Sequence, residues 1–378
     1  MIKKSLWLMM ILAVLLCGGC WNYRGLNEMS IVSGLAFDLD GTSGQYKVSF
    51  QIVDLTGNVK IEGINAKMLE SEGKTLFDAC RNAKKAILGK LYFGHTQLVV
   101  ISDKLARHQD LRDLIDWMLH DAEIRETLKI VISTEETAQE ILDNETLVGP
   151  IIAFDVSEYI EDDNEVTSST SYKQLYEVYD TLEADGIDLT VPALCNIESG
   201  GRTIPKLSGT AVFKGQRLAG YLSSDESKYF LFAVDKVKGG VLTVPANGEG
   251  RDNVTLEISD NRTSRSFTYK DGKLVMKLEP ETDVFLAECE GPLDAMDKQQ
   301  IKELEKNAAK TLAQRMVQTI QTVQSKYGAD IFGFGNFIHK SDMSLWKSLS
   351  KDWDTIYKTL EVQVNAKVNI ISSSCVKE

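Results

Sequence analysis

The alternation of apolar and polar positions is clearest in the last third of the chain. Apolar residues occupy every second position over residues 254–258 and again over 362–370, which predicts strands with one buried face. The Asp271-Gly272 pair separates two further strand-like runs and predicts a tight hairpin turn. Apolar residues recur every three or four positions over 301–327, which predicts a long amphipathic helix. We therefore expect a C-terminal α+β domain over residues 252–378, an antiparallel sheet with a long helix.

The first half of the chain mixes the two periodicities. Apolar-rich runs over residues 30–38 and 45–53, separated by a turn sequence, predict a hairpin. Strands and helices interleave after it, which predicts an N-terminal α+β domain over residues 20–198. A polar run rich in Ser and Thr over residues 161–171 predicts a loop or local disorder. The remaining predicted strands are 65–71, 91–102, 128–133 and 189–197, and the remaining predicted helices are 74–88, 111–119, 137–142 and 172–182.

Turn signals set residues 199–251 apart as a middle domain. Gly215-Gln216 predicts the turn of a hairpin, which is followed by a helix over 225–234 and a strand over 241–244. The expected fold class is therefore α+β: three mixed α/β domains with mainly antiparallel sheets, after a lipoprotein signal peptide.

The first twenty residues have the three-part pattern of an exported protein. Two lysines give a positive start, residues 5–16 are apolar, and small residues precede Cys20. The apolar run is shorter than the roughly 20 residues that a membrane-spanning helix needs. We expect a lipoprotein signal peptide over residues 1–19 and a diacylglyceryl group on Cys20, although Cys17 stands where the usual pattern has Leu. The alternative is an ordinary signal peptide with a chance cysteine.

The charge of the chain limits its partners. Its 378 residues carry a formal net charge of −13. This charge disfavours nucleic acid, because such binding neutralises phosphates with Lys and Arg. It also disfavours a body that lies flat on anionic lipid, so the lipid on Cys20 is the expected membrane contact. Four other cysteines show no spacing typical of a zinc or redox site, and we expect structural or free thiols. They are Cys80, Cys195, Cys289 and Cys375.

No motif of catalysis or cofactor binding stands out. Gly73-Lys74-Thr75 resembles the end of a phosphate-binding loop, but the glycine required five residues earlier is Met68, so we expect a turn and helix N-cap. There is no Gly-x-Ser-x-Gly nucleophile motif. The histidines have no metal-binding spacing. They are His95, His108, His120 and His339. We therefore predict that the protein is not an enzyme and has no catalytic residue, cofactor or metal site.

One segment, residues 328–340 (GADIFGFGNFIHK), sets phenylalanines among glycines. Phe332, Phe334 and Phe337 either form an exposed aromatic surface for a partner or pack into the core beside the long helix. The sequence leaves both interpretations open.

Five stretches carry a resemblance to a known family. They begin at Cys20, Gly73, Gly209, Asp330 and Trp353 and read CWNYRGLNEMSIVSGLAFD, GKTLFDACRNAKKAILGKLYFGHTQLVVIS, GTAVFKGQRLAGYLS, DIFGFGNFIHK and WDTIYKTLEVQVNAKVNI. In this order they resemble the Ger(x)C family, the lipoprotein C subunits of nutrient germinant receptors in spore-forming bacteria. Cys20 matches the family's lipidated cysteine, although the Trp-Asp that follows it in many members is here Trp21-Asn22.

The resemblance implies three α+β domains, lipid-anchored on the outer surface of the spore inner membrane and assembled with membrane-embedded A and B subunits. It names no ligand site in this subunit. The alternative class is a solute-binding lipoprotein that delivers a small molecule to a membrane transporter, which would have two similar α/β lobes with parallel sheets. A surface hydrolase would show nucleophile–base or metal spacing, which the sequence lacks.

Overall fold

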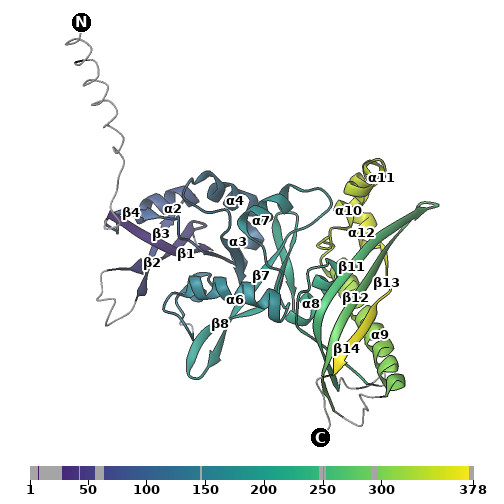
Figure 1. Cartoon of the computed structure of the whole chain (residues 1–378). Helices are drawn as coiled ribbons and strands as arrows, with labels where there is room; N and C mark the ends of the chain where they lie inside the picture. The colour runs from purple at the N-terminus through teal and green to yellow at the C-terminus, as the bar shows by residue number, and fades with distance from the viewer. Residues whose placement is uncertain are drawn as a thin grey trace.

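The computed structural model describes residue 7 and residues 28–41, 43–55, 64–144, 147–246, 250, 253–290 and 297–373. Apart from residue 7, the predicted signal peptide lies outside these residues, as do Cys17, Cys20 and Cys375. The described strands form two sheets, which divide the body into a first module (residues 28–222) and a second module (residues 223–373) (Figure 1). Within the described part of the chain, no helix is both long and apolar enough to cross a membrane.

The first module is built on a nine-stranded mixed sheet. Its strands are β1 (Met29–Leu39), β2 (Tyr46–Asp54), β3 (Asn65–Gly73), β4 (Lys90–Tyr92), β5 (Leu98–Ser102), β6 (Lys129–Ser133), β7 (Thr190–Ser199), β8 (Arg202–Lys214) and β9 (Arg217–Leu222). The central strands β1, β5, β6 and β7 are parallel, and β4 joins β1 in parallel. Antiparallel pairs flank this centre, with β2 and β3 on one side and β8 and β9 on the other. The parallel centre follows from runs that are buried along their whole length, as in β5 and β6.

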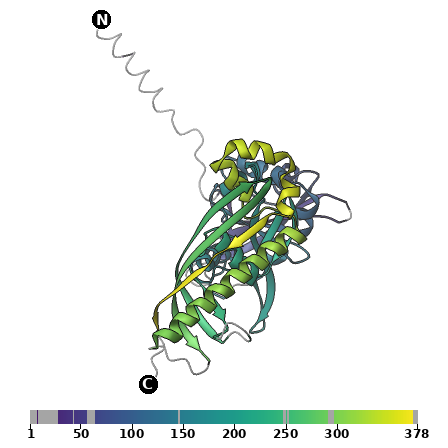
Figure 2. The same cartoon turned by 90° about the vertical axis from the view of Figure 1, so that its right-hand side faces the viewer.

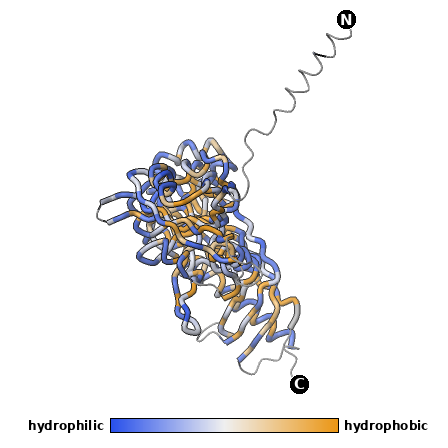
Figure 3. The backbone as a smooth tube through the Cα atoms, turned by 90° about the vertical axis from the view of Figure 1, so that its left-hand side faces the viewer, coloured by the Kyte–Doolittle hydropathy of each residue, from blue (hydrophilic) through white to orange (hydrophobic). Residues whose placement is uncertain are grey.

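Helices cover both faces of this sheet. One face packs against α2 (Leu76–Ala83), α3 (Asp103–His108), α4 (Leu111–His120) and α7 (Leu175–Glu183), and the other packs against α5 (Gln139–Leu142) and α6 (Ile152–Val166). Strand β1 contributes to the cores on both faces of the sheet, because successive side chains of a strand point to opposite faces. Leu35 and Phe37 lie in the core beneath α2, α3, α4 and α7, and Ala36 lies in the core beneath α5 and α6. Hydrophobic residues accordingly gather in the interior of the module, and hydrophilic ones lie on its outside (Figure 3).

The second module pairs a five-stranded sheet with a long helix. Its strands are β10 (Val241–Val244), β11 (Val254–Lys270), β12 (Lys273–Cys289), β13 (Glu361–Val364) and β14 (Lys367–Ser373). Its helices are α8 (Ser224–Ala233), α9 (Lys298–Lys326), α10 (Phe334–Ser341), α11 (Met343–Leu349) and α12 (Trp353–Lys358), with a 3₁₀ turn η2 (Ser350–Asp352). Figure 2 shows α9 lying along the twisted sheet. The turn between β11 and β12 places Asp271 and Gly272 at φ of 52° and 77°, as a tight hairpin requires.

The expected mixture of helices and sheets is confirmed. The hairpin around Gly215-Gln216, the hairpin around Asp271-Gly272 and the long amphipathic helix are confirmed as well. Parallel pairing is more extensive than expected, because both sheets are mixed: the first has its parallel centre, and β13 and β14 pair in parallel with β12.

Three local predictions were wrong. Residues 161–166 continue α6 instead of forming a loop, because the Asp163 carboxylate accepts hydrogen bonds from the Ser169 hydroxyl (2.6 Å) and the Thr170 hydroxyl (3.0 Å) and folds the polar run against the helix end. The predicted strand 91–102 is two strands, β4 and β5. The predicted strand 362–370 is likewise split into β13 and β14.

The predicted middle domain, residues 199–251, is shared between the two sheets. Strands β8 and β9 complete the first sheet, whereas α8 and β10 belong to the second module. The cores also meet, since Val212 and Leu222 of the first sheet lie in the same hydrophobic cluster as α8 and α9. The domain boundaries at residues 198 and 251 stay predictions.

Candidate functional site at the junction of the modules

Two loops from distant parts of the sequence meet where the modules join. Residues 184–189 connect α7 to β7, and residues 327–333 connect α9 to α10. The Asp188 N–H donates to the Asp330 carbonyl at 2.9 Å, and the Asp330 N–H donates to the Asp188 carboxylate at 2.7 Å. Because these reciprocal bonds join positions 142 residues apart, they fix the second module against the first.

The Asp330 carboxylate is enclosed by donors from its own module. The residue is 2% exposed. It accepts hydrogen bonds from the N–H groups of Phe334 (3.1 Å) and Gly335 (2.8 Å) and from the indole N–H of Trp353 (3.1 Å). The first two groups lie in the first turn of α10, where a helix leaves backbone donors unpaired. Asp330 therefore positions the starts of α10 and α12 together.

Burial raises the pKa of Asp330 to about 7. The N–H groups of Gly335 and Phe334 act to lower this pKa, and the negative charge of Asp188 acts to raise it. The protonation of this junction carboxyl therefore changes near neutral pH.

Asp188 is the bonding partner of Asp330 on the loop of the first module. Its carboxylate accepts hydrogen bonds from the Gly215 N–H (2.7 Å) and the Lys214 ammonium (3.2 Å). The same ammonium lies 2.7 Å from the carboxylate of Asp354 in α12. Burial opposes the charge on Lys214, but the carboxylates of Asp354 and Asp188 outweigh it and raise the lysine's pKa. Lys214 is therefore a charged bridge from β8 to the second module.

The loops approach so closely that two positions require glycine. Gly186 has a φ of 71°, and a Cβ there would lie 2.6 Å from the carbonyl carbon of Gly335. A Cβ on Gly335 would lie 2.8 Å from the indole of Trp353. Asn336 completes the contact, since its N–H donates to the Gly186 carbonyl (2.8 Å) and its side-chain amide to the Asp185 carbonyl (2.9 Å). A side chain at either glycine would push the loops apart.

Aromatic rings pack against Asp330 within the second module. Trp353, which donates to the carboxylate, meets Trp346 edge-on at 5.4 Å, and Trp346 stacks on the His339 ring at 5.7 Å. The Tyr357 hydroxyl is buried and has no hydrogen-bond partner among the described residues. Burial also raises the pKa of Tyr357, so this hydroxyl stays protonated.

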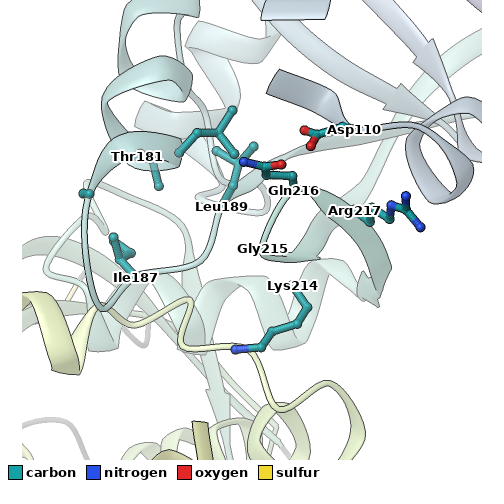
Figure 4. Close-up of a pocket in the computed structure, with 10 residues that line it drawn as sticks. Asp110, Thr181, Ile187, Leu189, Lys214, Gly215, Gln216 and Arg217 are labelled. Carbon is teal, nitrogen blue, oxygen red and sulfur yellow. The ribbon is translucent and has the colours of Figure 1, made fainter. Parts of the chain in front are cut away.

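A cavity of about 430 Å³ opens beside Lys214 on the side of the first module. Its walls come from the end of α7, from the loop that carries Ile187, and from the turn between β8 and β9. In Figure 4 the Gln216 side chain lies near Asp110, whereas Lys214 extends away from both toward the second module. The cavity is thus bordered by Lys214, which also binds Asp354 of the second module.

The structure decides between the two interpretations of the Gly-Phe segment, residues 328–340. Phe332 and Phe334 are 1% and 0% exposed, and their rings stack at 5.3 Å in the core of the second module. Phe337 is half-buried and meets Phe267 edge-on at 6.1 Å. Core packing is therefore confirmed for Phe332 and Phe334.

Other residues singled out in the sequence lie outside the junction. Thr75 is the N-cap of α2, and its hydroxyl accepts a hydrogen bond from the Asp78 N–H at 3.1 Å, which confirms the expected cap. In the described ranges, no group of three or more His, Cys, Asp or Glu residues is placed to hold a metal ion. Cys20 lies outside the described residues, so its lipidation stays a prediction.

The sequence did not identify the Asp188–Asp330 pair. Asp330 lies in the Gly-Phe segment, which did stand out, but its neighbours suggested aromatic packing and not a buried acid. Asp188 lies in a polar loop whose one available signal was the Asp185-Gly186 turn sequence.

Comparison with known proteins gives matches along nearly the whole chain. The model of the family described as "Spore germination protein N-terminal domain" matches residues 22–194, and that described as "Spore germination B3/GerAC like, C-terminal" matches residues 208–374. The chain is 25% identical over 394 residues to spore germination protein KC of Bacillus subtilis (strain 168), a match that covers 98% of this chain and 96% of the relative. It is 23% identical over 388 residues to spore germination protein B3 of the same organism, covering 98% and 97%.

A solved structure shares the fold. The crystal structure of the GerBC protein matches with a TM-score of 0.57 and 19% sequence identity, over 93% of this chain and 100% of that chain.

Proposed function

We propose, from the premise that this chain belongs to the GerAC-like family of spore germination proteins, that it is the lipoprotein C subunit of a nutrient germinant receptor. In this proposal Cys20 carries a diacylglyceryl anchor on the outer surface of the spore inner membrane. The body assembles there with the membrane-embedded A and B subunits that the resemblance implies. The subunit contributes binding surfaces to the receptor and catalyses no reaction.

The observation that carries this proposal is the match of the two family models, in order, over residues 22–194 and 208–374. The positive, apolar and small-residue pattern that ends at Cys20 supports the anchor. Two acyl chains suffice for stable attachment, because each buried methylene contributes about 0.8 kcal/mol and a single chain binds only marginally.

The junction supports a role as a receptor component. The reciprocal bonds of Asp188 and Asp330 and the bridge from Lys214 hold two unlike modules in one arrangement. A subunit that contacts two different partners needs its surfaces kept in a fixed relation, and this junction can provide it.

The described sheets argue against the solute-binding alternative. That class requires two similar lobes with parallel sheets, whereas here a nine-stranded mixed sheet accompanies a five-stranded sheet built around a long hairpin. This difference favours the receptor subunit over a solute-binding lipoprotein.

Affinity isolation from dormant-spore membranes tests the proposal. The full chain, tagged at its C-terminus, should recover polytopic A-type and B-type subunits after solubilisation in mild detergent. The Cys20→Ala variant serves as control and should leave the tagged protein in the soluble fraction. Recovery of a transporter in place of the A and B subunits would overturn the proposal.

A further inference from the structure

A second cavity, of about 480 Å³, lies between the two modules near the junction. From the first module it is lined by side chains of residues between 164 and 190, and from the second by Arg265 and by side chains of residues between 230 and 238 and between 331 and 340. Its volume lies in the range of small-molecule sites, about 300–1,000 Å³, which often occur at domain interfaces. A molecule in this cavity would contact both modules at once.

The lining of this cavity is cationic, although the chain as a whole has a net charge of −13. Five Lys or Arg side chains line it against two carboxylates. Both carboxylates are engaged, since Glu177 accepts from the Gln174 N–H at 2.9 Å and Asp188 accepts from the Gly215 N–H at 2.7 Å. A cleft lined mainly by one sign of charge concentrates ions of the opposite sign. The cationic side chains are Lys173, Lys236, Lys238, Arg265 and Lys340.

Three of these cations have no partner among the described residues. The ammonium groups of Lys173, Lys236 and Lys340 make no hydrogen bond or ion pair with any residue that the structure describes. Burial lowers the pKa of Lys173, although the charge of Glu177 acts in the opposite direction. Lys236 and Lys340 are exposed, whereas Lys173 is half-buried. A half-buried ammonium without a partner is unfavourable, and an anion in the cavity would remove this cost at Lys173.

We propose that this cavity binds a small organic dianion, with two carboxylate or phosphoryl groups, between the modules. Lys173 faces one group from the first module, and Arg265 and Lys340 face the other from the second. Arg265 is fixed by a hydrogen bond of 3.0 Å to the Phe332 carbonyl, and its planar guanidinium suits two-point binding of such a group. This binding belongs to the folded body and depends neither on the lipid anchor nor on the A and B subunits.

Calorimetric titration of the full-length lipoprotein in detergent micelles tests the proposal. Succinate and inorganic phosphate are the probes, and succinamide is the uncharged control of the same shape as succinate. We expect saturable binding of succinate that weakens as salt is added, and no binding of succinamide. Lys173→Met keeps most of the apolar stem and removes the charge, so it should weaken succinate binding at least tenfold. Lys306→Met, on the exposed face of α9 and away from the cavity, should leave binding unchanged.

If Lys173→Met fails to fold, Lys340→Met provides the test. Lys340 is exposed and contributes little to the core, so this variant should fold and should still bind succinate more weakly than the native protein. The absence of saturable heat with both probes would overturn the proposal. Equal binding of succinamide would do the same, as would an equal loss in Lys306→Met. Binding that requires the A and B subunits would also overturn the proposal, because the site is proposed to belong to the folded body alone.

Discussion

Asp330 makes the junction sensitive to pH. Because burial raises its pKa from 3.8 to about 7, the folded protein holds a proton between these values that the unfolded chain releases. Its contribution to stability is therefore complete below about pH 4 and is lost as the pH rises through about 7. Asp330→Asn, which keeps the shape and cannot titrate, should remove this loss, which is on the order of a few kcal/mol. Urea unfolding across this pH range measures the difference.

A matched control for this prediction is Asp297, the half-buried N-cap of α9. The N–H groups of Gln299 and Gln300 lower its pKa, so its contribution has the opposite sign and is lost only as the pH falls. Asp297→Asn should therefore alter the pH dependence of stability only in the acid range and leave the decline between about pH 4 and 7 unchanged. If Asp330→Asn leaves the decline between about pH 4 and 7 as steep as in the native protein, the titration of Asp330 is not its cause.

Gly186 tests how closely the two loops must approach. Gly186→Ala places a side chain on a residue in the left-handed region, which should lower the free energy of unfolding by about 1–2 kcal/mol. The same side chain meets the backbone of Gly335, which should add the roughly 1–3 kcal/mol typical of overpacking. Gly200, in the turn between β7 and β8, has a similar φ of 60° with open space around it. Gly200→Ala should therefore lose only the stability that the left-handed conformation costs, with no loss from overpacking. Denaturant midpoints of the two variants measure the difference, and equal losses would show that the loops move apart freely.

At the scale of elements, the sequence predicted best where the signal is local. The hairpins at Gly215-Gln216 and Asp271-Gly272 depend on two turn residues flanked by apolar runs, and α9 depends on its own periodicity. The C-terminal half of α6 was missed because the Asp163 carboxylate binds the hydroxyl groups of Ser169 and Thr170, which follow the helix, and no apolar pattern reports such bonds. The junction was missed for a related reason: Asp188 and Asp330 become a pair only once both modules have folded.

The Gly-Phe segment should behave as core and not as a free surface. Phe332→Ala should reduce the free energy of unfolding by about 3–5 kcal/mol, because the ring packs between Phe230 at 5.6 Å and Phe334 at 5.3 Å. Phe77→Ala is the control, since that ring is 58% exposed on α2, and it should cost less than about 1 kcal/mol. Thermal unfolding followed by circular dichroism compares them. A Phe332→Ala protein as stable as Phe77→Ala would contradict the core assignment.

At the scale of the whole molecule, the two modules form one body with unlike halves. The hydrophobic cluster of the second module includes Val212 and Leu222 of the first sheet, and α8 packs on the long helix α9. The modules are therefore connected by apolar packing as well as by the polar junction. A change at the junction should for this reason weaken the connection between the modules while each sheet keeps its own packing.

Two substitutions should separate the anchor from the body. Cys20→Ala removes the proposed lipid and should release the protein from spore membranes while its melting temperature stays the same, because Cys20 precedes the folded modules. Asp188→Ala should do the reverse: the protein stays in the membrane fraction but melts earlier, since the buried N–H of Asp330 loses its acceptor at about 1–3 kcal/mol. Immunoblots of washed membranes and thermal unfolding in detergent measure the two properties. Retention of Cys20→Ala in washed membranes would contradict the anchor, and an unchanged melting temperature for Asp188→Ala would contradict the role of the junction.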